Sequence, residues 1–67
     1  MPVINVQMLK GRTEEQKATF IKEVAGVAMR TLQVPEQAVV ILISEVAQEN
    51  WGAGSRTMAE IRSAQSK

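Results

Sequence analysis

Very few residues of this chain can act as a nucleophile or a base. The 67 residues include no cysteine and no histidine, so thiolate nucleophiles, histidine-based triads and zinc sites built on these ligands are excluded. Ser44 and Ser55 have no recognisable partner base, and the seven acidic residues form no recognisable pair. One unusual candidate stands at the start of the chain, which reads "MPVINVQ". If Met1 is removed, Pro2 carries a free secondary amine that can accept a proton.

Pro2 also has a purely structural interpretation, because proline lacks a backbone N–H and commonly begins a strand. Two other residues favour a chemical role. Arg12 lies in a glycine turn, where its guanidinium can bind a carboxylate through two hydrogen bonds, although a solvated loop cation would look the same. Trp51, in the loop "NWGAGS", can form the wall of a pocket or anchor a subunit interface.

Composition narrows the class of protein. The net charge is +1, from eight basic and seven acidic residues that are interspersed, which argues against an electrostatic nucleic-acid binder. One tryptophan, one phenylalanine and no tyrosine make a stacking platform for single strands improbable. The longest apolar run, "AVVILI", is too short to span a bilayer, and no signal peptide is visible. We therefore expect a cytoplasmic protein.

The elements that must position these residues follow from periodicity. "VINVQML" at 3–9 alternates as a strand with one face more buried than the other. "TEEQ" at 13–16 is a capping box that begins an amphipathic helix, and Pro35 requires this helix to stop near Val34. Gly26, inside the helix, indicates either slack on a solvated face or close packing of another backbone. A second, β-branched strand is expected over 38–46, so strand, helix and strand form a β-α-β unit with parallel strands.

This second strand cannot be covered within one chain. Its apolar run is continuous, which is usual where both faces are buried, yet one helix covers only one face of a two-stranded sheet. Other copies of the chain should supply the missing cover. We expect a single domain over 1–67, in which Met58 and Ile61 anchor a short hairpin or a turn of helix onto a neighbour, with 63–67 as a frayed tail.

The pattern resembles the 4-oxalocrotonate tautomerase family from Pro2 to about Arg62. The resemblance rests on Pro2, the seven-residue strand, "GRTEEQK", the helix that ends before Pro35, the β-branched strand and "NWGAG". It implies an α/β fold: a β-α-β subunit with parallel strands and a short C-terminal hairpin, assembling as a homohexamer, a trimer of dimers. It also implies a small enol or keto acid as the substrate, with no metal, cofactor, nucleic acid or membrane.

The same resemblance implies the reaction and its residues. Pro2, exposed by loss of Met1, acts as the general base that removes a proton from an enol hydroxyl and returns one to carbon, which gives the ketone. Arg12, from a neighbouring subunit, binds the substrate carboxylate, and Trp51 and Val40 line the substrate pocket. A free α-amine has a reference pKa of about 7.7–8.0, and burial beside a cation such as Arg12 should lower that pKa toward neutrality.

Val40 departs from the family pattern, because the best-known members carry a second arginine there. Two alternatives to a tautomerase therefore stay open. One is a sibling activity on the same fold, namely hydration, dehalogenation or decarboxylation of a small unsaturated acid. The other is a non-catalytic oligomeric module. Whether Met1 is removed or retained distinguishes the catalytic hypotheses, which need a free Pro2 amine, from the non-catalytic module.

Val40 predicts a preference among enol acids. A second carboxylate against Val40 and Trp51 would lose water without gaining a partner, whereas an apolar group there gains about 25 cal/mol per Å² buried. We expect kcat/KM to be higher for enol acids of the phenylenolpyruvate type than for 2-hydroxymuconate, and Val40→Arg to shift the preference toward the dicarboxylate. If the unmodified protein already prefers the dicarboxylate by about tenfold, or about 1.4 kcal/mol, another cation such as Arg56 or Arg62 fills the role and this reading of Val40 is wrong.

Overall fold

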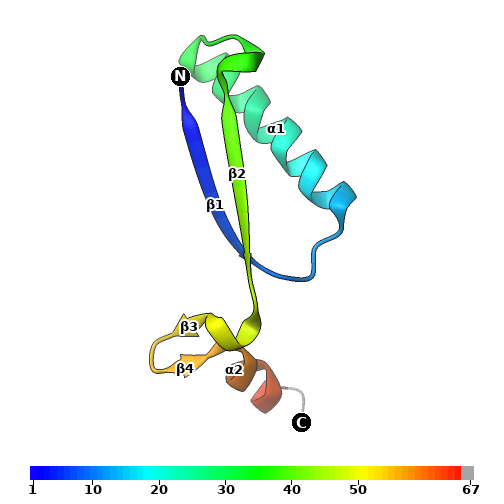
Figure 1. The fold of residues 1–67 in the computed structure, drawn as a ribbon, viewed down its shortest axis with the longest axis vertical. Helices are drawn as coiled ribbons and strands as arrows, with labels where there is room; N and C mark the ends of the chain where they lie inside the picture. Colours follow the sequence, from blue (N-terminus) through cyan, green and yellow to red (C-terminus); the bar gives the residue numbers. More distant parts are fainter. Residues whose placement is uncertain (66–67) are drawn as a thin grey trace.

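The computed structural model describes residues 1–65, and the first part of the chain forms a β-α-β unit (Figure 1). Strand β1 spans Val3–Leu9, helix α1 spans Glu14–Leu32 and strand β2 spans Val40–Val46. The two strands pair in parallel, from Val3 opposite Val40 to Leu9 opposite Val46. The predicted α/β fold and the parallel pairing are therefore confirmed.

Helix α1 begins and ends where local sequence signals require. The Thr13 hydroxyl accepts a hydrogen bond from the Gln16 amide, and the Gln16 side chain accepts one from the Thr13 amide, both at 3.0 Å. The predicted capping box is thus present. At the other end Gln33 adopts a left-handed conformation, with φ 59°, and its N–H donates to the Met29 carbonyl at 3.1 Å. The helix therefore ends at Leu32, close to the predicted stop.

Glycine 26 does not mark a close backbone contact within the subunit. A Cβ atom added at Gly26 would lie 3.5 Å from the Arg30 guanidinium and would meet no backbone of another element. Of the two interpretations of Gly26, slack on a solvated face fits the subunit better than close packing of another backbone.

Strand β2 begins two residues later than the sequence pattern indicated. Residues Glu36–Ala38 form a short 3₁₀ turn, η1, in which the Ala38 N–H donates to the Pro35 carbonyl and the Val39 N–H to the Glu36 carbonyl. These bonds use the backbone donors that a strand would direct toward β1. The predicted strand over 38–46 is therefore corrected to Val40–Val46.

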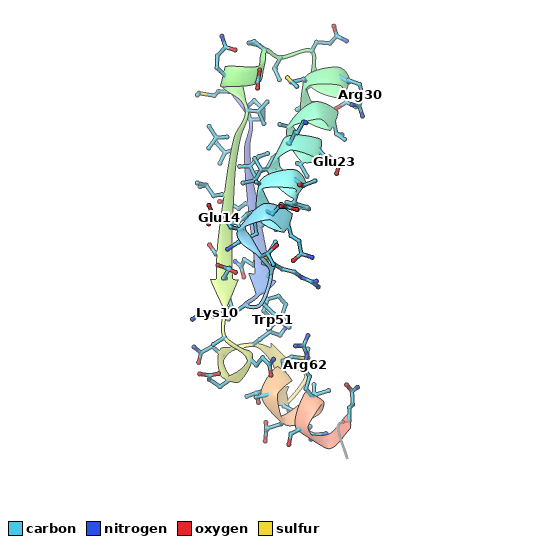
Figure 2. The ribbon with its side chains drawn as sticks, turned by 90° about the vertical axis from the view of Figure 1, so that its right-hand side faces the viewer. Lys10, Glu14, Glu23, Arg30, Trp51 and Arg62 are labelled. Atoms are coloured by element: carbon cyan, nitrogen blue, oxygen red, sulfur yellow. The ribbon has the colours of Figure 1, made fainter. Side chains whose placement is uncertain are left out.

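Helix α1 covers one face of the sheet and leaves the other open (Figure 2). Ile4, Val6 and Met8 lie on the half-buried side of β1, as the alternation predicted. An ion pair between Lys17 and Glu45, at 2.9 Å, ties the start of α1 to β2. Val3 and Leu42, at 56% and 52% exposure, show that the opposite face carries apolar side chains that no element of the subunit covers.

The remaining residues form a small C-terminal unit beyond the end of the sheet, so that the subunit measures 47 × 24 × 15 Å (Figure 1). A 3₁₀ turn, η2, spans Gln48–Asn50. An antiparallel hairpin follows, with β3 over Gly52–Ala53 and β4 over Arg56–Thr57. Helix α2 then spans Met58–Gln65. Both forms expected around Met58 and Ile61, the hairpin and the helix, are present.

The expectation of a frayed tail over 63–67 is wrong for residues 63–65, which belong to α2, and residues 66–67 lie outside the described part. The physical reason is a second capping box. The Glu60 carboxylate accepts from the Thr57 amide at 2.9 Å, and the Thr57 hydroxyl accepts from the Glu60 amide at 3.1 Å. These two bonds satisfy donors at the start of α2 and stabilise the helix through its last described turn.

One subunit does not close a hydrophobic core. Among residues 1–65, the only side chain in the buried class is Ala28, at 5% exposure. Phe20, Ile21, Val27 and Leu32 of α1 remain at least 37% exposed. No helix in the described part of the chain is long and apolar enough to cross a membrane. We therefore expect other copies of the chain to cover the exposed faces of α1 and of the sheet.

This open face predicts self-association. Replacing Leu42 by glutamate puts a charge where another copy would bury it, and an unpaired buried charge is strongly unfavourable. Light scattering at micromolar concentration should show an oligomer for the unmodified protein and a smaller species for Leu42→Glu. Gln37→Glu adds the same charge to the exposed turn η1, outside the exposed faces of α1 and of the sheet, and should leave the assembly unchanged. A folded monomer of the unmodified protein would contradict the prediction.

Candidate active site

Pro2 stands at the start of β1, and the strand pair holds it in place. The Val40 N–H donates to the Pro2 carbonyl at 3.0 Å, immediately before the paired residues Val3 and Val40. Pro2 is half-buried, whereas Met1 is 86% exposed. Removal of Met1 would therefore sacrifice little packing and would leave a proline ring whose backbone is fixed next to Val40.

A groove of about 490 Å³ lies at the opposite end of β1. Its lining consists of the last part of the strand, the loop that follows, Trp51 and one residue of α2: Gln7, Met8, Leu9, Lys10, Gly11, Arg12, Trp51 and Arg62. Its volume suits a small organic ligand. The predicted site residues Arg12 and Trp51 therefore do meet, within one subunit, in one groove.

The loop that carries Arg12 depends on glycine. The Lys10 N–H donates to the Val46 carbonyl at 3.0 Å, which extends the pairing of the strands by one residue. Gly11 then takes φ 128°, a conformation that residues with a side chain rarely adopt. The chain turns there, and Arg12 is placed between the groove and the capped start of α1.

Pro2 and Arg12 do not meet within one subunit. The seven residues of β1 separate them, and at about 3.3 Å per residue the strand alone spans about 20 Å. The subunit thus brings together Pro2 and Val40 at one end of the sheet, and Arg12 and Trp51 at the other. A site that uses all four residues has to be assembled from more than one copy of the chain.

The groove is electropositive. Lys10, Arg12 and Arg62 line it, and no carboxylate does. Within residues 1–65, no ion pair involves these three side chains. Such a groove attracts an anion, and Trp51 and Met8 add apolar wall beside the charges. The same residues 1–65 contain no group of three or more acidic side chains that could hold a metal ion.

Sequence reasoning did not place Arg62 in this groove. Arg62 reaches it because α2 begins at Met58, directly after the short hairpin. The signal that could have revealed the helix is "TMAE" at 57–60, a capping box like the one at 13–16. The hydrogen bond from the Thr57 amide, followed by the interaction with the Thr57 side chain, holds the pKa of Glu60 below its ordinary value.

Known proteins share this fold and the length of this chain. The sequence profile of a family described as tautomerase enzyme matches residues 2–60. A 2-hydroxymuconate tautomerase of Pseudomonas putida is 36% identical over 62 residues, which cover 92% of this chain and 98% of that protein. A probable tautomerase of Bacillus cereus is 33% identical over 60 residues, covering 90% and 98%.

Solved structures agree. TomN, a 4-oxalocrotonate tautomerase homologue of the tomaymycin biosynthetic pathway, superposes with a TM-score of 0.90 at 34% identity, over 92% of this chain and 95% of TomN. A 4-oxalocrotonate tautomerase isozyme of Methylibium petroleiphilum gives 0.91 at 35% identity, over 94% and 98%. A heterohexamer 4-oxalocrotonate tautomerase of Chloroflexus aurantiacus gives 0.86 at 35% identity, over 92% and 100%.

The β-α-β subunit is that of a tautomerase, and this chain belongs to the tautomerase family. It is an isomerase of the keto-enol class, similar to 4-oxalocrotonate tautomerase. The resemblance identified in the sequence and the expectation of an enzyme are confirmed, and the alternative of a non-catalytic module is set aside.

Proposed function

We propose that the protein converts 2-hydroxy enol acids to their keto forms, without a cofactor, with the amine of a processed Pro2 as the general base. The observation that carries this proposal is the position of Pro2. Its carbonyl is bonded to the Val40 N–H at 3.0 Å while Met1 is 86% exposed, so processing would leave a proline amine at a fixed point. Membership of the tautomerase family supports the same reaction.

The chemistry requires one base and no external reactant. The Pro2 nitrogen takes the proton of the enol hydroxyl, the O–H electrons form the carbonyl bond, and the enol π electrons move to carbon. That carbon then takes a proton back from the proline ammonium, so the product is an isomer of the substrate. The backbone bond from the Val40 N–H to the Pro2 carbonyl, at 3.0 Å, holds the residue that carries this base in a fixed position.

Arg12 supplies the binding group for the substrate carboxylate. Because about 20 Å of β1 separates the two ends of the sheet, the Arg12 that serves a given Pro2 belongs to another subunit. Trp51 lines the same groove of that subunit as Arg12 and forms an apolar wall of the pocket. We propose a homohexamer, a trimer of dimers, as the assembly that brings the two ends together.

The role of Pro2 is tested by mass and by turnover. Intact mass should show a protein that lacks Met1, and Pro2→Ala should lose most activity, because a primary amine differs from proline in basicity and shape. A matched preparation with an uncleaved residue before Pro2 should be inactive, since the nitrogen is then an amide. Full activity in that preparation would exclude the proline base.

Arg12→Ala should weaken binding of an acidic substrate. The change leaves the carboxylate without a charged hydrogen bond, which costs on the order of 1.5–3 kcal/mol. The loss should appear mainly in KM, provided that the contact is equally strong in the ground state and the transition state. Arg30→Ala removes the same charge from the exposed last turn of α1 and should leave KM unchanged. Unchanged kinetics in Arg12→Ala would rule out the role.

A further inference from the structure

We propose that the ion pair between Lys17 and Glu45 positions Arg12 for binding the substrate carboxylate, so that both members of the pair are positioning residues outside the groove. The inference rests on the proposed function for the role of Arg12. It gives a part in ligand binding to two charged side chains that the sequence analysis did not connect, one near the start of α1 and one near the end of β2.

The loop that carries Arg12 is held only at its two ends. On the strand side the Lys10 N–H donates to the Val46 carbonyl at 3.0 Å, and on the helix side Thr13 caps α1. In the part of the chain that the structure describes, neither Gly11 nor Arg12 makes a hydrogen bond of its own. The location of Arg12 therefore depends on where the start of α1 lies relative to the sheet.

Lys17 attaches the start of α1 to the sheet. Its ammonium lies 2.9 Å from the Glu45 carboxylate, and the two side chains are 27% and 30% exposed. Of residues 14–20, which begin the helix, only Lys17 is half-buried, and the others are exposed. Ala28, in the later part of the helix, is buried at 5% exposure. Within the subunit, packing therefore holds the later part of α1, and the ion pair is the main contact that holds its start.

The ion pair lies directly beside Arg12. Arg12 and Lys17 line the same small cleft of about 160 Å³, to which Met8 and Phe20 contribute apolar wall. Glu45 is the partner of Met8 in the strand register, and Met8 also lines the Arg12 groove. Lys17 does not line that groove, and its charge is balanced by Glu45. The pair is thus placed to fix Arg12 without contacting the ligand.

Removing the Glu45 carboxylate separates positioning from simple electrostatics. Glu45→Gln deletes a negative charge near an electropositive groove, so a purely Coulombic effect would tighten the binding of an acid. Loss of positioning predicts the opposite, a weakening of about threefold, which is the range expected for a partly exposed ion pair. Binding of a neutral analogue should not change.

Unreactive ligands measure this effect without relying on catalysis. Trp51 is the only tryptophan of the chain and lines the groove, so its fluorescence reports occupancy. The probes are 3-phenylpropanoate and its neutral amide, 3-phenylpropanamide, titrated into the assembled protein. With an enol acid as substrate, the same loss should appear as a rise in KM with kcat unchanged.

Three further variants test the helix side of the pair. Lys17→Met removes the charge but keeps most of the apolar stem, and it should weaken the acid as Glu45→Gln does. Lys17→Arg keeps a cation that can reach Glu45 and should bind the acid as the unmodified protein does. Arg30→Met removes a positive charge from the exposed last turn of α1 and should also leave binding unchanged.

A double-mutant cycle with Arg12→Ala shows whether the pair acts through Arg12. Weaker acid binding in Glu45→Gln that disappears in the Arg12→Ala background supports the proposal. Tighter or unchanged acid binding, an equal loss for acid and amide, or a loss that persists without Arg12 overturns it. Circular dichroism and light scattering establish that each variant is folded and assembled. Should Glu45→Gln fail either check, the cycle between Lys17→Met and Arg12→Ala decides in the same way.

The two proposals fail in different ways. If Arg12→Ala itself leaves acid binding intact, the proposed role of Arg12 is wrong and this inference is overturned with it. If Arg12→Ala weakens acid binding while Glu45→Gln and Lys17→Met do not, the role of Arg12 stands and only the positioning by the ion pair is overturned.

Discussion

The length of the parallel strand pair is the constraint on which the rest of the structure depends. Seven residue pairs, from Val3–Val40 to Leu9–Val46, hold β1 against β2 and keep its two ends about 20 Å apart. Hydrogen bonds just beyond the pairs, from Val40 to Pro2 and from Lys10 to Val46, fix both ends. Pro2 at one end and the groove lined by Arg12 at the other cannot approach each other by any small motion of the subunit.

The same strand pair explains the exposed apolar surface. Two strands and one helix enclose too little volume for a core, so Leu42 and Val27 stay about half exposed. Burying such surface is the main favourable term available to a chain of this size. In the proposed assembly, association would both cover this apolar surface and bring Pro2 of one subunit to Arg12 of another.

Local features of this fold were predictable from the sequence, and long-range ones were not. Helix α1 was predictable because Thr13, Gln16 and Pro35 mark its ends through bonds and restrictions within a few residues. The start of β2 was not, because "QAVV" reads as a strand and the competing 3₁₀ bond from Ala38 to Pro35 leaves no apolar pattern. Pro2, Arg12 and Trp51 were identifiable by residue type. The sequence analysis named Arg62 only as an alternative cation, because its place in the Arg12 groove depends on where α2 begins, and the capping box "TMAE" that marks this start was not identified.

The separation of the two functional ends has a consequence for how such proteins can diverge. In the proposed assembly a chain contributes Pro2 to one site and Arg12 to another, so a duplicated gene can lose one of the two functions while the other copy supplies it. One copy can keep the base while the other specialises its groove around Trp51 and Arg62 for a new acid. The heterohexamer of Chloroflexus aurantiacus, whose fold matches this chain, shows that mixed assemblies of this architecture exist. A mutation that would inactivate an enzyme with a self-contained site can be complemented here by the other copy, which allows the two copies to specialise.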